Sequence, residues 1–275
     1  MTASREAGSG VLSPRLDALV LAAADNSGRL RQASSEAFEA LIPIGKQPMV
    51  AYVTGALSRA RRVGRIICVG PPAVVEAAVA GAQAAAAEVV GVEPGARLID
   101  NLERGLHASK TGHVVVVTSD IPLLQPHMVD DFVRRCEEGG ELFDVWYAVV
   151  ERSAGERAYP GVRRTWVRLS DGTFTGGNVM VVARDIVQRT RRLLGPALDA
   201  RKSPLTLAKL LGLAAVLRFL VGRLSIADAE QRVSAMLGIR GKAVVTPYAE
   251  IGIDVDKPSD LELARRFLTP THAGA

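Results

Sequence analysis

Four short apolar segments, rich in β-branched residues, alternate along this chain with longer helical patterns. The strand candidates are residues 18–23, 65–69, 114–118 and 145–150, and the helical patterns cover 49–60, 73–87, 98–109 and 126–138. This alternation indicates βαβ units, whose strands form a mostly parallel sheet. Because the strand candidates are continuously apolar, we expect helices to cover both faces of that sheet. The sequence therefore predicts a three-layer α/β fold.

Near residue 185 the alternation of strand and helix patterns ends, and amphipathic helical patterns follow one another. They run through Leu194 and then over 203–211, 213–220 and 225–237, and a capping-box variant of Ser225 and Asp228 opens the last of them. A final strand is expected at 242–246 and a closing helix at 258–267. We expect one domain over 16–268, which includes a helical insert at 185–238, between flexible tails at 1–15 and 269–275.

Composition narrows the class of protein. The net charge of +5 is mild and spread along the chain, which suits phosphate-bearing ligands. No basic block with interleaved aromatic residues is present, so nucleic-acid binding is not expected. Cys68 and Cys136 lie in apolar runs and do not indicate a disulfide or metal framework. The first fifteen residues lack a signal-peptide core, and the longest run without charged residues, 172–183, is too short to span a bilayer. We therefore expect a cytoplasmic protein.

The first strand candidate runs into a loop of small and polar residues, L-A-A-A-D-N-S-G-R at 21–29. A strand that ends in such a loop brings backbone N–H groups up to a phosphate. Neither G-x-G-x-x-G nor G-x-x-x-x-G-K-[ST] is present, so the two glycine-rich phosphate fingerprints do not apply. A short apolar run follows at 41–45 and ends at Pro48.

A carboxylate follows the strand candidate at 114–118, in the run V-V-V-V-T-S-D-I-P-L-L. The turn of Ser119 and Asp120 therefore falls at the carboxyl end of a strand, where open α/β sheets bind ligands. An aspartate in this place can hold Mg²⁺ against phosphate oxygens. The same residue can instead shape the turn ahead of Pro122. On spacing alone, both interpretations stay open.

Three further segments each have a structural and a functional interpretation. The run I-G-I-D-V-D-K-P-S-D-L at 251–261 can be a strand end followed by a helix start, or its carboxylates can take part in a site. The run D-G-T-F-T-G-G-N-V at 171–179 can be an ordinary hairpin, or its glycines and asparagine can approach a ligand. The run P-G-A-R-L-I-D-N-L at 94–102 is typical of a helix start.

In this order along the chain, the motifs resemble those of the NTP transferases with a molybdenum-cofactor guanylyltransferase-like domain. The resemblance covers residues 16–268 apart from the insert at 185–238, and it lies in 21–23, Arg29, 41–45, Pro48, 119–123 and 254–261. It implies a glycosyltransferase-A-type fold, that is, a nucleotide-diphospho-sugar transferase-like three-layer sheet with helices on both faces.

The resemblance also implies an activity and roles for particular residues. The activity is Mg²⁺-dependent transfer of a nucleoside monophosphate from an NTP to a small phosphorylated or hydroxyl acceptor, with release of pyrophosphate. Asp120 and Asp256 would be the catalytic metal ligands. Gly177 and Asn178 would line the acceptor pocket. The residues that would bind the nucleotide are Leu21, Ala22, Ala23, Ala24, Arg29, Asn101 and Ser119.

Two residues depart from the pattern of the family. Ala24 stands where a loop glycine is expected, and it has less backbone freedom than glycine. Glu39 stands where the family has a lysine that neutralises the β- and γ-phosphates, and Lys46, Arg29 and Arg31 are the cations that could compensate. Two alternatives to nucleotidyl transfer therefore stay open. One is glycosyl transfer from a nucleotide-sugar, and the other is nucleotide binding without catalysis.

The segment at 205–224 is unusually apolar for its length. A helix that is hydrophobic over much of its circumference is covered by protein, by a partner subunit or by lipid. Lys209, Arg218 and Arg223 interrupt the segment too often for a membrane span. We expect a packed helical pair, extended by a homodimer contact, and we do not favour contact with a membrane surface.

Overall fold

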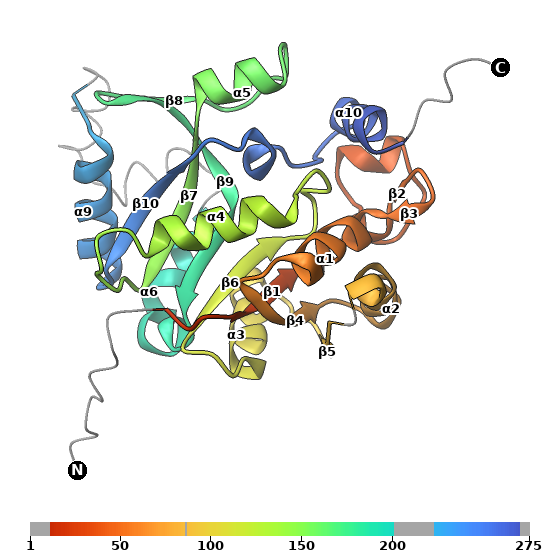
Figure 1. The fold of residues 1–275 in the computed structure, drawn as a ribbon, viewed down its shortest axis with the longest axis horizontal. Helices are drawn as coiled ribbons and strands as arrows, with labels where there is room; N and C mark the ends of the chain where they lie inside the picture. The colour runs from red at the N-terminus through yellow and green to blue at the C-terminus, as the bar shows by residue number, and fades with distance from the viewer. Residues whose placement is uncertain (1–11, 86, 201–222, 270–275) are drawn as a thin grey trace.

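An eight-stranded sheet runs through the molecule, with helices against both of its faces (Figure 1). The computed structural model describes residues 12–85, 87–200 and 223–269. The strands of the sheet are β1 (Leu16–Leu21), β4 (Val63–Val69), β5 (Val89–Val92), β6 (His113–Thr118), β7 (Val145–Glu151), β8 (Val167–Leu169), β9 (Gly172–Ala183) and β10 (Gly241–Thr246). A separate small hairpin pairs β2 (Pro43–Ile44) with β3 (Gln47–Pro48).

The described α-helices are α1 (Met49–Arg59), α2 (Pro72–Ala82), α3 (Leu98–Ala108), α4 (Pro126–Cys136), α5 (Arg152–Ala158), α6 (Ile186–Ala200), α9 (Ile226–Leu237) and α10 (Pro258–Leu268). The described residues also form the short 3-10 helices η1 (Arg29–Gln32), η2 (Glu39–Leu41), η3 (Gln83–Ala85) and η4 (Ala249–Gly252). Several helices begin as the sequence indicates. Pro72, Pro126 and Pro258 each occupy a first-turn position, where the missing N–H of proline costs nothing.

The strand order is β10-β7-β9-β6-β1-β4-β5, with β8 attached to β9. β1 pairs in parallel with both β4 and β6, and β7 pairs in parallel with β10. β9 runs antiparallel to its neighbours β6 and β7. The chain moves outward from β1 to β4 and β5, and then returns to the other side of β1 with β6. The switch in strand order therefore lies beside β1, where sheets of this kind place their ligands.

Alternate residues of β1 face different layers. Ala18 and Val20 belong to a buried cluster that includes Val53 of α1 and Phe132 of α4. Leu19 belongs to a second buried cluster, which includes residues of α3, α6 and α9. Because successive strand residues point to opposite faces, this split shows that helices cover both sides of the sheet. The predicted three-layer α/β fold with a mostly parallel sheet is confirmed.

The boundaries show where sequence patterns were incomplete. The strand expected at 18–23 spans Leu16–Leu21, and the helix expected at 73–87 ends at Ala82 and continues as η3. β5 was not predicted as a strand, and β9 is much longer than the hairpin arm expected around Gly172. Leu12, placed by sequence in the amino-terminal tail, is buried in the same cluster as Ala18.

The helical insert is described at its two ends. α6 and α9 lie where helices were expected, and the predicted Ser225–Asp228 capping box is confirmed, with the Asp228 N–H donating to Ser225 Oγ at 3.0 Å. The helices predicted at 203–211 and 213–220 lie outside the described residues, as does most of the apolar segment at 205–224. Within the described part of the chain, none of the helices combines the length and apolar character needed to cross a membrane.

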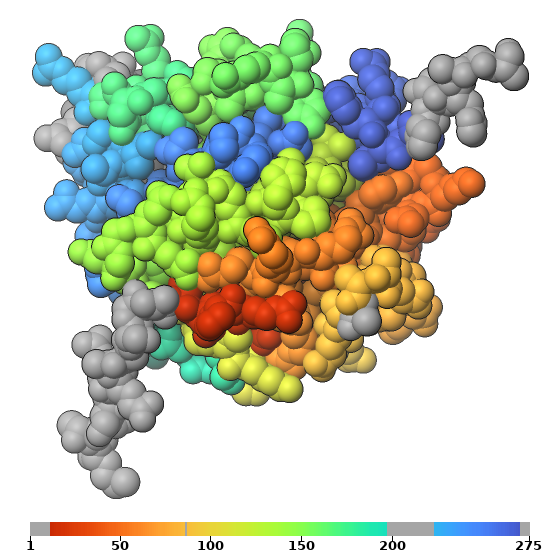
Figure 2. Space-filling model, viewed as in Figure 1, coloured from red at the N-terminus to blue at the C-terminus, as the bar shows by residue number. Residues whose placement is uncertain are grey.

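A small apolar cluster joins the two ends of the described chain. Leu30, Ile42, Ile44 and Met49 pack there against Val255, Leu261 and Ala264. We call these seven residues the loop–helix core. Arg265 of α10 donates to the carbonyl oxygen of Pro43 at 3.2 Å. In Figure 2, α10 in dark blue lies on the same face as the orange residues that follow the loop after β1.

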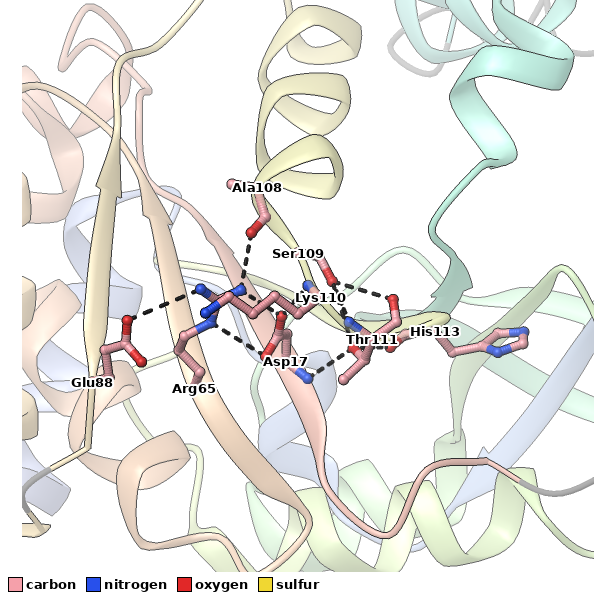
Figure 3. A network of polar contacts seen from close by, with 8 residues as sticks. All are labelled: Asp17, Arg65, Glu88, Ala108, Ser109, Lys110, Thr111 and His113. Atoms are coloured by element: carbon pink, nitrogen blue, oxygen red, sulfur yellow. Dashed lines mark hydrogen bonds and ion pairs between the residues drawn. The ribbon is translucent and has the colours of Figure 1, made fainter.

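A polar network lies at the amino-terminal ends of β1 and β4 (Figure 3). Arg65 Nη2 lies 2.8 Å from Asp17 Oδ2 and 2.9 Å from the carbonyl oxygen of Ala108. The backbone N–H of Lys110 donates to the same aspartate at 2.7 Å. Burial alone would raise the pKa of Asp17, but Arg65 and this N–H lower it below its usual value. This network therefore stabilises the amino-terminal ends of these strands, and the carboxyl ends of β1 and β6 lie at the other end of the sheet.

Candidate active site

The carboxyl ends of β1 and β6 lie side by side, and the residues of the candidate site follow directly after them. The backbone N–H of Ser119, just after β6, donates to the carbonyl oxygen of Leu21 at 3.2 Å. The N–H of Ala22 donates to Val69 of β4 at 2.9 Å. The sequence placed Leu21, Ala22 and Ser119 in a nucleotide site, and the structure brings these residues together at the switch in strand order.

Three aspartates meet at this edge of the sheet. One carboxylate oxygen from each of Asp120, Asp254 and Asp256 lies within 4.8 Å of the other two. We call these three residues the acidic cluster. Asp120 follows β6, and Thr118 Oγ1 donates to its Oδ1 at 2.5 Å. The other two aspartates lie in the extended segment between η4 and α10. The cluster therefore joins a central strand to the closing segment.

The electrostatics of the cluster indicate surplus negative charge. Removal from water raises the pKa of Asp120 to about 7, the Thr118 hydrogen bond opposes that shift, and Asp254 and Asp256 add to it. The pKa of Asp256 is raised too, by partial removal from water and by Asp254. A divalent cation would relieve this repulsion, and carboxylate oxygens are the ligands that Mg²⁺ prefers. Asp120, Asp254 and Asp256 therefore fit a divalent cation such as Mg²⁺ and are the residues that could hold it.

Sequence reasoning paired Asp120 with Asp256 and missed Asp254. A usable signal was present in the D-V-D spacing, because alternate residues of an extended segment point to the same side. Val255, between the two aspartates, is 1% exposed and packs into the loop–helix core. Burying the middle side chain turns both carboxylates the other way. α10 then begins at once, and Asp260 Oδ2 accepts a hydrogen bond from the Asp256 N–H at 3.2 Å.

Asn178 and Gly177 lie on β9 at the same edge. Val179 of β9 pairs with Val117 of β6, so Asn178 is next to the end of that strand. The Asn178 side-chain amide donates to the carbonyl oxygen of Ile251 at 3.4 Å. At Gly177 a Cβ would lie 2.8 Å from Ile251 Cγ2, so close packing against η4 explains this glycine without a ligand. Contact of Gly177 and Asn178 with an acceptor stays a prediction.

The loop after β1 is held by its own side chains. The buried Asn26 amide donates to the carbonyl oxygens of Ser34 and Glu36, at 3.0 and 2.9 Å. The backbone N–H of Glu39 donates to Ala24 at 3.1 Å. A Cβ on Gly28 would lie 3.7 Å from Glu39 Oε1, which places that carboxylate against the loop. The structure therefore puts a negative charge where the family pattern has a lysine.

Arg29, Arg31 and Lys46, the cations that could compensate for the missing lysine, differ in their contacts. Arg31 donates to the carbonyl oxygens of Ser35 and Glu36 and so belongs to the loop framework. Arg29 and Lys46 are exposed, and neither forms an ion pair with a carboxylate of the described residues. Of the three, Arg29 and Lys46 are therefore available to a ligand.

Asn101 has a structural partner. It lies in the first turn of α3, and its Oδ1 accepts a hydrogen bond from the Gly95 N–H at 2.6 Å. The bond fixes the turn after β5 and occupies one of the two lone pairs of that oxygen. Contact between Asn101 and a nucleobase stays a prediction.

Comparison with known proteins decides the family. The family model described as MobA-like NTP transferase domain matches residues 18–207. This chain belongs to that family. The matched range includes the loop after β1, Asp120 and Asn178, while Asp254 and Asp256 follow it in the sequence.

Individual relatives agree with membership of the MobA-like NTP transferases. A solved structure of a hypothetical transferase from Thermus thermophilus is 34% identical, with a TM-score of 0.74, over 90% of this chain and 99% of that one. A 2-C-methyl-D-erythritol 4-phosphate cytidylyltransferase from Frankia casuarinae is 34% identical over 122 residues, which are 44% of this chain and 43% of that protein. The alignment thus spans less than half the length of that curated relative.

A more distant structure shares the fold of this MobA-like NTP transferase domain. The CMP:2-keto-3-deoxy-manno-octonic acid synthetase in complex with CTP has a TM-score of 0.56 and 18% identity, over 92% of this chain and 98% of that one. The nucleotide-diphospho-sugar transferase-like sheet expected from the sequence is therefore confirmed as the fold.

Proposed function

We propose that this chain is a Mg²⁺-dependent nucleotidyltransferase that transfers a nucleoside monophosphate from an NTP to a small phosphorylated or hydroxyl acceptor. The observation that carries this proposal is the acidic cluster, whose three carboxylates lie within 4.8 Å of one another beside the loop after β1. Membership of the MobA-like NTP transferase family supports the same reaction class.

In this reaction an acceptor oxygen attacks the α-phosphorus of the NTP. The bond from the α-phosphorus to the bridging oxygen breaks, and pyrophosphate leaves with the electron pair. A hydroxyl acceptor gives its proton to water or to a base, whereas a phosphate acceptor has none to lose. Catalysis of this kind depends mainly on positioning and on stabilisation of charge.

The residues of the chain supply the positioning. The loop at 21–29 follows the carboxyl end of β1, where its backbone N–H groups that have no internal partner would contact the phosphates. Asp120, Asp254 and Asp256 would hold Mg²⁺, which would offset the charge of the α-phosphate and of the attacking oxygen. Asn178, next to the end of β6, would orient the acceptor.

CTP is the nucleotide to test first, with a phosphorylated polyol as acceptor. The support is the Frankia casuarinae relative, which is named as a cytidylyltransferase acting on 2-C-methyl-D-erythritol 4-phosphate. That alignment covers 122 residues, so the base and the acceptor are the parts of the proposal that need direct measurement.

The test measures pyrophosphate release with each of the four common NTPs, Mg²⁺, and a panel of polyol and sugar phosphates. We expect one NTP to support turnover, and Asp120→Asn to lower the rate by roughly 10²-fold or more, as loss of a charge-stabilising group does. The control is Glu262→Gln, which removes an exposed carboxylate on the neighbouring α10 and should leave turnover unchanged. Turnover by Asp120→Asn at the wild-type rate would contradict the assignment.

Nucleotide binding without transfer is the second candidate, and the position of Glu39 favours it. Its carboxylate lies against the loop after β1, beside Gly28, and cannot neutralise the β- and γ-phosphates that leave as pyrophosphate. Millimolar NTP raises the melting temperature in proportion to ln(1 + [L]/Kd), so binding is measurable without an acceptor. A nucleotide that stabilises the protein without pyrophosphate release across the acceptor panel would support this candidate.

A further inference from the structure

The acidic cluster already has a positively charged neighbour. Arg164, in the connection between α5 and β8, forms an ion pair through Nη1 with Asp254 Oδ1. Its Nη2 donates to the backbone carbonyl oxygen of Asp254 at 2.8 Å. The Arg164 side chain is only 11% exposed. Among the described residues, Arg164 is the cation that forms an ion pair with a member of the cluster.

The segment that carries Arg164 is anchored without the help of Asp254. Tyr159 Oη donates to Glu250 Oε1 at 2.9 Å, and the Tyr159 ring packs with Ala249 and Ile253. Trp166 packs over Gly155, where a Cβ would lie 2.8 Å from the indole ring. Because these contacts lie on either side of Arg164 in the sequence, they hold its backbone near the cluster without the Arg164–Asp254 ion pair.

The guanidinium and a divalent cation need the same carboxylate. Asp254 is one of three oxygen donors within 4.8 Å, and a lone pair directed at Arg164 is not available to a metal. The nearby Lys257 does not play this part, because its Nζ pairs with Asp260 at 3.0 Å. One protein cation therefore offsets part of the charge of the cluster.

We propose that Arg164 is a positioning residue that serves as an internal counter-cation of the acidic cluster and is displaced from Asp254 when a divalent cation binds. The inference rests on the proposed function, since it takes the cluster to be the metal site. Competition with Arg164 weakens cation binding to the protein alone. The cation then enters together with the triphosphate, whose oxygens supply the additional ligands. Arg164 thus sets the order in which cation and nucleotide arrive.

The test is a Mn²⁺ titration in the absence of nucleotide, with the free ion counted by its electron paramagnetic resonance signal. We expect Arg164→Ala and Arg164→Gln to bind Mn²⁺ about tenfold more tightly or better than wild type, since one adjacent unit charge is removed. Arg164→Lys keeps the charge and should bind near the wild-type level. The matched control is Arg163→Ala, which removes the same charge from the exposed neighbouring residue.

A purely structural role for Arg164 would lower the melting temperature of these variants without changing Mn²⁺ affinity. Arg164→Gln keeps a hydrogen-bond donor for the Asp254 carbonyl oxygen. It therefore tests whether Arg164 competes with the cation if Arg164→Ala does not fold. Equal or weaker Mn²⁺ binding by the folded Arg164→Ala and Arg164→Gln variants, compared with Arg163→Ala, would overturn this inference alone. Absence of Mn²⁺ binding in every protein, with and without CTP, would overturn the metal site of the proposed function as well.

Discussion

The backbone N–H of Val255 donates to the backbone carbonyl oxygen of Asp120 at 2.8 Å. This main-chain bond joins the end of β6 to the segment that carries Asp254 and Asp256. The two backbone segments that carry the three carboxylates are therefore held together by a bond that involves none of their side chains. Replacing any of the three by asparagine should change the charge of the cluster and leave its backbone in place.

Glu39→Lys should strengthen the binding of a nucleoside triphosphate. The Glu39 carboxylate lies against the loop at Gly28, and its replacement by an ammonium exchanges repulsion of the phosphates for attraction. Charged hydrogen bonds contribute roughly 1–3 kcal/mol, so we expect the Kd to fall about 5- to 150-fold in calorimetric titration. Glu36→Lys, an exposed charge reversal in the same loop, is the control. Weaker binding by Glu39→Lys would indicate that the carboxylate has a role of its own.

Asp17→Asn should destabilise the protein without affecting the site. Asp17 and Arg65 have 7% and 10% exposed side chains, and the substitution leaves Arg65 buried without its counter-charge. Breaking such a pair costs about 3–5 kcal/mol, which urea unfolding would measure. The control is Glu88→Gln, because Glu88 is 64% exposed and lies 4.0 Å from the same arginine, a contact worth about 1 kcal/mol or less. A loss below that of the control would show that the network in Figure 3 does not stabilise the fold.

Stability should decrease in mildly acidic solution because of His113. Its Nε2 lies 3.1 Å from the carbonyl oxygen of Phe143, its ring meets Trp146 edge-on, and burial lowers its pKa. The unfolded chain then binds the proton more readily than the folded one. The free energy of unfolding should therefore fall as the pH drops below about 6.5, the ordinary value for histidine, toward the lower folded pKa.

Urea unfolding between pH 5 and 7.5 checks this dependence. His113→Gln should flatten the decrease, whereas His107→Gln, which removes an exposed imidazole on α3, should not. An unchanged slope in His113→Gln would assign the acid sensitivity to other groups.

Gly81→Ala should destabilise the packing of α1 against α2. A Cβ at Gly81 would lie 2.4 Å from the backbone oxygen of Ala51 and 2.5 Å from Thr54 Oγ1, so the helices would have to separate. Overpacking of this kind costs about 1–3 kcal/mol, which exceeds the gain of roughly 0.5–1 kcal/mol in helix propensity. The melting temperature should fall for Gly81→Ala and stay unchanged for Gly112→Ala, where no atom lies within 4 Å of the added methyl group.

Local sequence patterns predicted the three-layer fold and the position of Asp120 after β6, because each of these depends on residues close together in the sequence. The continuous apolar runs of β1 and β6 and the S-D-x-P turn are examples. β9 was harder to predict, because Gly176 and Gly177 interrupt its apolar pattern and read as a loop. Their reason is tertiary: a Cβ at Gly176 would lie 2.3 Å from Tyr147 Oη, and Gly177 packs against η4.

Other features of the site arise from contacts that no local pattern contains. Arg164 meets Asp254 across the fold, and nothing near Arg164 in the sequence marks it among the other arginines. Asn101 shows the opposite case. Sequence indicated a base contact for this residue at a helix start, but it did not indicate the hydrogen bond that its oxygen accepts from the Gly95 N–H.

The loop–helix core has a consequence for how this molecule folds. Its members Leu30, Ile42 and Ile44 come from the start of the domain, while Val255 and Leu261 come from its end. Contacts between residues so distant in sequence close large loops and form slowly. The central sheet can assemble around β1, β4 and β6 first. Pulse-labelling hydrogen exchange during refolding should then show the amides of β6 protected early and those of 253–256 protected late.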